Sequence, residues 1–328
     1  MKVIVTGGTG FLGMTLARNL LDRDGLTGPS GTIEPIDSLV LFDVVAPLES
    51  LRDLGDRATV VVGNVADGEL VRSIIDRDDV SVFHLASMVS GGCELDFDGA
   101  LSTNLDGARA VLEACRARPS RPRLVFSSSI AAFGGAAVAG TVSDSTKLTP
   151  GTTYGTTKAI CELLVNDYTR KGFLDGRSAR LPTVVIRPGR PNAAASSWVS
   201  GVFREPLNGN ECVVPVDAGT SVPLSGYRTV VENLVRVHEV AGEALGADRA
   251  LNLPAIDVTA EEMITALRRA TDRPLGPIHI RPDPTIVGFF RGWAKHSSFE
   301  RATALGLARD SDVETIIRTY IEDFLDHK

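Results

Sequence analysis

Residues 2–13, KVIVTGGTGFLG, decide the fold. A short β-branched run leads into Gly7, Gly10 and Gly13, and apolar residues at helical spacing follow. Glycine backbone can approach a phosphate closely, and the N-terminus of a helix attracts the anion. Because the glycines stand between a predicted strand and a predicted helix, they predict a dinucleotide-binding loop in which Phe11 and Leu12 also contact the ligand.

Further β-branched runs alternate with helical stretches, which is typical of a parallel sheet covered on both faces. We predict strands at residues 2–6, 38–42, 58–62, 81–85, 123–127 and 183–187. The fold class is therefore α/β, with a Rossmann-type doubly wound parallel sheet and a smaller, interleaved C-terminal substrate lobe. The sheet domain is expected to span residues 1–188, with residues 227–253 returning to it, and the lobe to span mainly residues 189–328.

Helical periodicity predicts one helix over residues 97–118. Two later helices are expected to begin with capping boxes, Thr259 with Glu262 and Ser311 with Glu314. The second of these has an apolar stripe that indicates a core-facing helix.

Composition excludes several classes of function. A formal net charge of −7 gives no basic patch for nucleic acid or an anionic membrane. No apolar run approaches the ~18 residues that a membrane span needs, and the strand that follows Met1 directly leaves no room for a targeting peptide, so we expect a cytoplasmic protein. The four cysteines and five histidines lack metal-ligand spacing, so we expect no metal.

Asp43 ends the second predicted strand and is placed to accept hydrogen bonds from ribose hydroxyls. A carboxylate there repels a 2′-phosphate, which favours NAD over NADP. Asp43 stands 30 residues after Gly13, whereas the motif leads one to expect roughly 20. Residues 24–37 are rich in Gly, Pro and Asp, and we interpret them as a loop that accounts for the excess.

Tyr154 and Lys158 lie four residues apart at the start of a predicted helix, so they share one face. An ammonium beside a phenol, together with an oxidised nicotinamide, favours the phenolate and makes Tyr154 a candidate acid/base. Residues 127–129, three serines, end the fifth predicted strand at the carboxyl edge of the sheet, where open α/β folds bind ligands.

The order TGGTGFLG, HLA, VFSSS and YGTTK resembles that of the extended short-chain dehydrogenases/reductases over about the first 190 residues. The resemblance implies that Ser129, with Ser128 as the second choice, binds the substrate oxygen, that Tyr154 exchanges its proton and that Lys158 holds the nicotinamide ribose. It also implies a homodimer. The further cofactor-binding residues that it implies are Asn64, where the family usually has Asp, and Val65, Leu85, Ala86, Asn104, Pro188 and Gly189.

Residues 186–209, IRPGRPNAAASSWVSGVFREPLNG, resemble a branch of that family which oxidises the 2-hydroxyl of a four-carbon sugar acid, D-erythronate, with NAD. A small hydroxy acid needs a fork of donors for its carboxylate, which Arg supplies, and polar groups for its hydroxyls. The candidate substrate-binding residues, besides Ser128, Ser129 and Tyr154, are Asn192, Ser196, Ser197, Arg204 and Arg228.

Three alternatives stay open. A nucleotide-sugar epimerase or dehydratase would use the same Ser, Tyr and Lys, although Gly226 stands where such enzymes have a pyrophosphate-binding Arg and no acidic pair follows Ser129. An L-threonine or hydroxysteroid type of dehydrogenase shares every catalytic residue. A non-catalytic NAD-sensing module is disfavoured because Ser129, Tyr154 and Lys158 are all present.

Overall fold

The computed structural model describes residues 1–47, 51–191 and 194–326. The chain divides into two compact units, each assembled from three segments. The first unit comprises Met1–Ala132, Thr152–Arg180 and Val231–Leu251, and the second comprises Phe133–Gly151, Leu181–Val230 and Asn252–Lys328. These bounds differ from the predicted boundary at residue 188. Residues 133–151 join the second unit because their strand β8 (Thr141–Val142) pairs with β16 (His296–Ser297).

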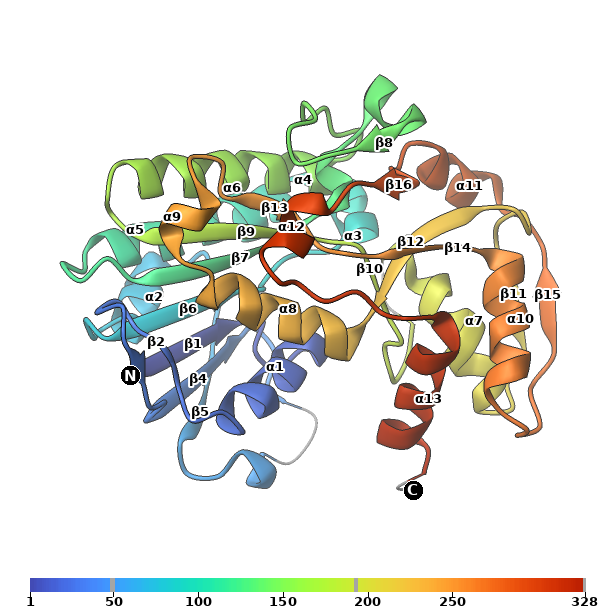
Figure 1. Ribbon diagram of the computed structural model, residues 1–328, viewed down its shortest axis with the longest axis horizontal. Coiled ribbons are helices and arrows are strands. Elements are labelled where there is room, and N and C mark those ends of the chain that lie inside the picture. The colour runs from blue at the N-terminus through green and yellow to red at the C-terminus, as the bar shows by residue number, and fades with distance from the viewer. Residues whose placement is uncertain (48–50, 192–193, 327–328) are drawn as a thin grey trace. The chain divides into compact units, whose positions relative to one another are not determined.

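The first unit is built on a parallel sheet, which confirms the predicted fold class (Figure 1). Within the described residues seven strands form it, in the order β13-β9-β7-β6-β1-β4-β5. Their bounds are β1 Lys2–Thr6, β4 Ser38–Asp43, β5 Ala58–Val62, β6 Val80–His84, β7 Arg123–Ser129, β9 Asp175–Leu181 and β13 Ala250–Asn252.

The strand order reverses at β1. From β1 the chain adds β4 and β5 on one side and then β6 and β7 on the other, with all these pairs parallel. The loops that follow β1 and β6 therefore diverge at a topological switch point, the place where open α/β sheets bind ligands.

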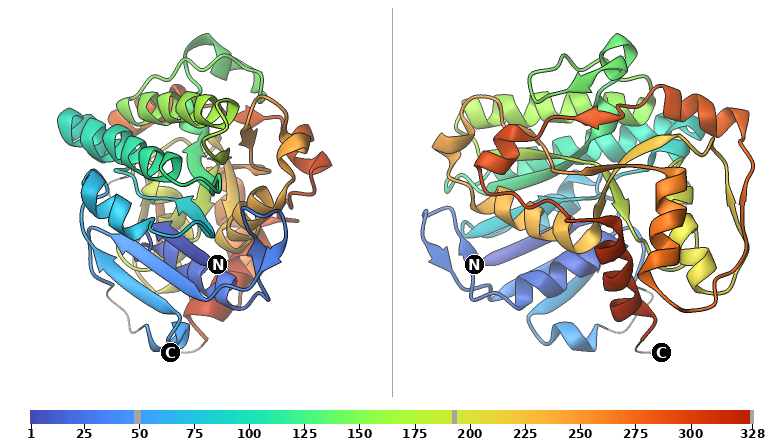
Figure 2. Two further views of the ribbon diagram at one scale, coloured as in Figure 1. Left: turned by 90° about the vertical axis from the view of Figure 1, so that its left-hand side faces the viewer. Right: turned by 45° about the vertical axis from the view of Figure 1, so that its right-hand side comes forward.

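Helices cover both faces of this sheet (Figure 2). Apolar residues of α2, α5 and α6 pack on the face that presents Ile4, Val82 and Phe126, while α1 packs against β1 and β4 and the Phe83 ring stacks on His238 of α8. The bounds are α1 Phe11–Leu21, α2 Gly68–Ile74, α3 Ser90–Leu95, α4 Phe97–Ala100, α5 Gly107–Arg116, α6 Thr153–Arg170, α8 Tyr227–Glu239 and α9 Gly242–Leu245. The helix expected over residues 97–118 is interrupted by a π-helical segment, Leu101–Asp106.

Two sequence expectations about this unit were wrong. The predicted strand at residues 183–187 is β10 (Thr183–Val185), which pairs with β12 (Ser221–Gly226) in the second unit. Its place in the main sheet belongs to β9, which carries the buried side chains of Arg177 and Arg180. Residues 24–37, expected as a loop, contain a hairpin of β2 (Leu26–Thr27) and β3 (Ile33–Glu34).

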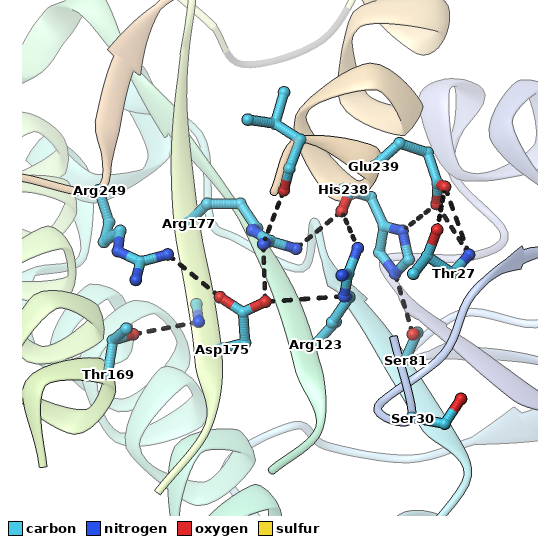
Figure 3. Close-up of polar contacts among 12 residues, drawn as sticks. Thr27, Ser30, Ser81, Arg123, Thr169, Asp175, Arg177, His238, Glu239 and Arg249 are labelled. Carbon is cyan, nitrogen blue, oxygen red and sulfur yellow. Dashed lines mark hydrogen bonds and ion pairs between the residues drawn. The ribbon is translucent and has the colours of Figure 1, made fainter. Parts of the chain in front are cut away.

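A network of charged residues lies where β7 and β9 begin and α8 ends (Figure 3). Three arginines surround Asp175: Arg177 at 2.8 Å, Arg249 at 3.1 Å and Arg123 at 3.6 Å. We call these four residues the Asp175 cluster. Arg123 and Arg177 also donate hydrogen bonds to the His238 carbonyl, at 2.9 and 2.8 Å, and so cap the C-terminus of α8.

His238 and His84 are fully buried, which predicts loss of stability in acid. Burial lowers the pKa of His84 to about 3 and that of His238 to about 4. Below the ordinary pKa of 6.5 the histidines of the unfolded chain bind protons, whereas the two buried histidines of the folded protein stay neutral. The free energy of unfolding therefore falls as the pH drops. We expect a loss of about 1.4 kcal/mol per pH unit for each histidine between about pH 6.5 and 5.

Urea denaturation across that pH window measures the loss. The pKa of Glu239 is lowered to about 2, so its contribution to stability is lost only below about pH 4.5. Glu239 therefore does not affect the slope measured in this pH window. His238→Gln, which cannot take up a proton, should remove one histidine's share of the slope. An unchanged slope in that variant would contradict the assignment.

The second unit has smaller sheets. β10 and β12 pair in parallel, β12 pairs antiparallel with β14 (Ile256–Thr259), and β11 (Cys212–Val214) pairs with β15 (Ile278–Ile280). The helices are α7 Ser197–Leu207, α10 Ala260–Ala270, α11 Pro284–Arg291, α12 Glu300–Ala304 and α13 Val313–Phe324. Residues of α7, α10 and α13 share one hydrophobic core with the strands.

Of the two predicted capping boxes, one is present in the structure. Thr259 and Glu262 form the box at the start of α10. At α13 the prediction was wrong, because Asp312, and not Ser311, caps the helix and accepts a hydrogen bond from the Thr315 amide at 2.6 Å. The apolar stripe of α13 faces the core, as expected. Helices long and apolar enough to cross a membrane are absent from the part of the chain that the structure describes.

Candidate active site

The glycine loop joins β1 to α1 at the switch point. Gly7 has a φ of +69°, and a Cβ there would lie 2.9 Å from the amide nitrogen of Ala86. A Cβ at Gly13 would lie 2.2 Å from the Gly7 carbonyl oxygen, so both positions require glycine. Gly10 occupies the N-cap of α1, where no side chain caps the helix and no acidic residue stands in the first turn. This exposed helix N-terminus fits the phosphates of a dinucleotide.

Asp43 lies beside this loop at the end of β4. Its carboxylate accepts hydrogen bonds from the amides of Thr9 at 3.1 Å and Val45 at 3.3 Å. The side chain therefore braces the glycine loop and is half-buried at the sheet edge. The hairpin of residues 26–34 accounts for the long interval between Gly13 and Asp43 without displacing the strand end.

The remaining predicted cofactor residues of the first unit follow neighbouring strands. Asn64 and Val65 come after β5, where the Asn64 side chain is exposed and accepts a hydrogen bond from the Ala66 amide at 2.9 Å. Leu85 and Ala86 come after β6 and are half-buried. These residues and the glycine loop therefore lie at the same edge of the sheet.

Asn104 lies inside the π-helical segment, and its side chain is buried. Its amide oxygen accepts a hydrogen bond from the Met88 amide at 2.7 Å, and its amide nitrogen donates to Thr157 at 3.2 Å and to the Cys93 sulfur at 3.4 Å. Asn104 thus ties the loop after β6 to α6. Because this side chain is buried and bonded to protein groups, its contacts in this structure support the site's loops.

The predicted catalytic residues come together where α6 begins and β7 ends. Thr152 caps α6, and the Glu94 carboxylate accepts a hydrogen bond from the Thr153 amide at 2.8 Å. One turn separates Tyr154 from Lys158, whose ammonium nitrogen lies 5.5 Å from the centre of the Tyr154 ring. That ammonium donates a hydrogen bond to the Ser127 carbonyl at 2.7 Å.

Burial sets the charge states of this pair. It raises the pKa of Tyr154 to about 12, although a hydrogen bond with the Ser129 side chain lowers it in part. It lowers the pKa of Lys158 to about 8. The sequence led us to expect that the ammonium and an oxidised nicotinamide together favour the phenolate. In the protein alone burial dominates the pKa of Tyr154, so a phenolate needs positive charge nearby.

Of the two candidate serines, Ser129 is the more accessible. Its hydroxyl accepts a hydrogen bond from the Ala131 amide at 3.1 Å and stays half-buried. Ser128 is 2% exposed, and its hydroxyl donates to Glu162. The geometry therefore favours Ser129 as the serine that contacts a substrate, whereas the Ser128 side chain points into the protein.

The candidate substrate residues of the second unit have varied surroundings. Pro188 and Gly189 follow β10, and Ser196 and Ser197 begin α7, all of them half-buried except the exposed Gly189. Asn192 lies outside the described residues.

The two predicted carboxylate-binding arginines are both engaged with protein groups. Arg204 is 3% exposed and donates to Glu205 at 2.6 Å and to the Arg187 carbonyl at 2.9 Å. Arg228 pairs with Asp323 and Glu322 of α13 on the surface. In this structure each guanidinium is already paired with a carboxylate, Arg204 with its neighbour in the sequence and the half-exposed Arg228 with residues of α13 that lie far away in the sequence.

Comparison with known proteins places the chain in a family. The model of the NAD dependent epimerase/dehydratase family matches residues 3–241. The chain is 45% identical to a D-erythronate dehydrogenase of Cupriavidus necator, over 98% of each chain. It is 40% identical to a D-erythronate dehydrogenase of Haemophilus influenzae, over 98% of this chain and 99% of that one.

Among solved structures, a nucleoside-diphosphate-sugar epimerase from Agrobacterium tumefaciens superposes with a TM-score of 0.89 at 36% identity, covering 99% of this chain and 94% of that one. The matched family is NAD dependent, which implies a nicotinamide cofactor. The chain therefore belongs to the NAD dependent epimerase/dehydratase family and is an oxidoreductase.

Proposed function

We propose that this protein oxidises the 2-hydroxyl of D-erythronate to 2-dehydro-D-erythronate with NAD. The observation that supports this choice of substrate is the full-length similarity to two D-erythronate dehydrogenases. The site supports the reaction class, since Ser129, Tyr154 and Lys158 converge at the carboxyl edge of the sheet.

In this mechanism the substrate's 2-hydroxyl lies between the Ser129 hydroxyl and the Tyr154 phenol oxygen. Tyr154 as phenolate accepts the hydroxyl proton, the C2–H bond breaks, and the carbon–oxygen double bond of a 2-keto acid forms. When bound, the nicotinamide supplies the hydride acceptor and a positive charge. Lys158, fixed by the Ser127 carbonyl, adds a second positive charge beside the phenol and holds the ribose.

Asp43 is proposed to select NAD. The Asp43→Ala variant should lose preference for NAD over NADP by at least about tenfold, because a repulsion of about 1.4 kcal/mol with the 2′-phosphate corresponds to that factor. The ratio of kcat/KM for the two cofactors measures it. Asp43→Asn keeps an oxygen acceptor for the Thr9 amide and separates loss of charge from loss of bracing. An unchanged ratio in both variants would exclude this role.

The surroundings of Gly226 argue against a nucleotide-sugar substrate. At Gly226, where the resemblance places an arginine in nucleotide-sugar enzymes, the Asp310 carboxylate accepts hydrogen bonds from the Gly226 amide at 2.9 Å and from the hydroxyls of Ser225 and Thr229 at 2.7 and 2.6 Å. A carboxylate at this end of α8 repels a diphosphate.

The test is NADH formation with D-erythronate, L-threonate, L-threonine and a UDP-hexose measured in parallel. Turnover confined to the sugar acids, with D-erythronate preferred, is the expected result. Turnover of L-threonine or the UDP-hexose alone would overturn the substrate while leaving the cofactor assignment intact.

We also propose a homodimer formed through the helices next to the site. Leu95 of α3, Phe97 of α4 and Leu163 of α6 are 88%, 58% and 65% exposed, and α3 and α4 pack against α6. Exposed apolar side chains on adjoining helices are typical of an interface. Sedimentation should give the mass of a dimer, and Leu163→Glu should give that of a monomer. A monomeric wild type would exclude the proposal.

A further inference from the structure

Successive turns along one face of α6 contact the serine run at residues 127–129. The first two contacts, made by Tyr154 and Lys158, belong to the proposed reaction. The third is made by Glu162, whose carboxylate accepts a hydrogen bond from the Ser128 hydroxyl. Because the three helix residues are spaced four apart, they lie one above the other on the same face.

Glu162 is held from its other side by Arg180 of β9. The Arg180 Nη2 lies 2.7 Å from one carboxylate oxygen, and its Nε lies 3.0 Å from the other. Both side chains are buried, with 2% and 3% of their surface exposed. Apolar side chains in place of such a buried pair are often neutral or stabilising. Stability alone therefore does not account for a buried pair one turn from Lys158.

We propose that Glu162 is a positioning residue for the reaction: Arg180 orients its carboxylate, and the carboxylate holds Ser128 and thereby the end of β7 against α6. The backbone of Ser128 joins the Ser127 carbonyl, which holds Lys158, to Ser129, whose side chain bonds to Tyr154. A shift of Ser128 moves both partners at once. This inference rests on the proposed function, because it concerns the same reaction.

The charge of Glu162 acts on the same site. Burial lowers the pKa of Lys158, while Cys161, Cys93 and Glu162 act to raise it. Without the carboxylate the ammonium should lose its proton at lower pH. The alkaline limb of the kcat profile then moves to lower pH, a result that a purely structural role would not produce.

Three variants and one control test the proposal. Ser128→Ala removes the hydroxyl and keeps the ion pair, and we expect kcat to fall about tenfold with KM and NAD affinity nearly unchanged, since orientation alone is disturbed. Glu162→Met combined with Arg180→Met removes both charges without leaving one unpaired. For it we expect kcat to fall about 100-fold. Glu162→Gln removes the negative charge and keeps Arg180, and for it we expect the alkaline limb at lower pH. The control Tyr168→Phe removes the hydrogen bond of another α6 side chain, to Glu113, and should leave kcat unchanged.

Unchanged kcat in Ser128→Ala, together with an unmoved pH profile in Glu162→Gln, would overturn the proposal. If the double variant does not fold, Ser128→Ala decides alone. A wild type that turns over another alcohol of the panel would overturn the substrate only, and the same variants measured on that alcohol would still test Glu162.

Discussion

Replacing Tyr154 with phenylalanine is expected to abolish turnover, with kcat lower by on the order of 10³-fold or more. The phenol oxygen forms a hydrogen bond with the Ser129 side chain and, in the proposed mechanism, contacts the substrate hydroxyl. Phenylalanine keeps the ring beside the Lys158 ammonium but cannot accept the proton. NAD affinity, measured by fluorescence titration, should stay within about twofold of the wild type, because the glycine loop is untouched.

The matched control for this change is Tyr168→Phe, further along the same helix, where the hydroxyl donates a hydrogen bond to Glu113. It should keep full activity. If Tyr154→Phe lost NAD binding and turnover to the same degree, the tyrosine would have a structural role and the proposed chemistry would fail. Residual activity near that of the wild type would mean that another group accepts the proton.

Asp175→Asn is expected to lower the free energy of unfolding by about 3 kcal/mol, because removing one partner of buried charges leaves the others uncompensated. Asparagine has nearly the same volume as aspartate, so the change removes charge alone. In the Asp175 cluster three guanidiniums then face one another, and the side chain of Arg177 is fully buried. Urea denaturation at neutral pH measures the loss.

Asp167→Asn is the control for this prediction. Asp167 pairs with Arg170 on the surface of α6, where both side chains are more than half exposed, and such a pair contributes less than about 1 kcal/mol. Equal, small losses in the two variants would mean that the carbonyls at the end of α8 neutralise the arginines without Asp175.

The parts of the fold that could be predicted depend on local sequence. The glycine loop, the first strand and the position of Asp43 follow from β-branched runs and glycine spacing, which act over a few residues. β9 could not be predicted in this way. The segment DGRSARL resembles a surface stretch until the acidic partners of Arg177 and Arg180 are known, and these come from the strand itself and from α6.

The same limit applies to the site. Tyr154, Lys158 and Ser129 could be named because helical spacing and a strand end place them. Arg228 carries the charge that a carboxylate requires, yet α13, almost a hundred residues later, supplies its partners. Glu162 was missed although its spacing from Lys158 was visible, since nothing local indicated that its carboxylate is buried.

The alternation of the chain between its two units has a consequence for biosynthesis. The main sheet receives its last strand, β13, only when residue 252 has been made. By then two segments of the second unit have been synthesised, and the final segment of that unit starts where the first unit ends. Neither unit can complete its core while the nascent chain is short, and a truncated transcript that ends near residue 190 encodes an unfinished sheet. A library of N-terminal fragments should therefore yield stable protein only close to full length.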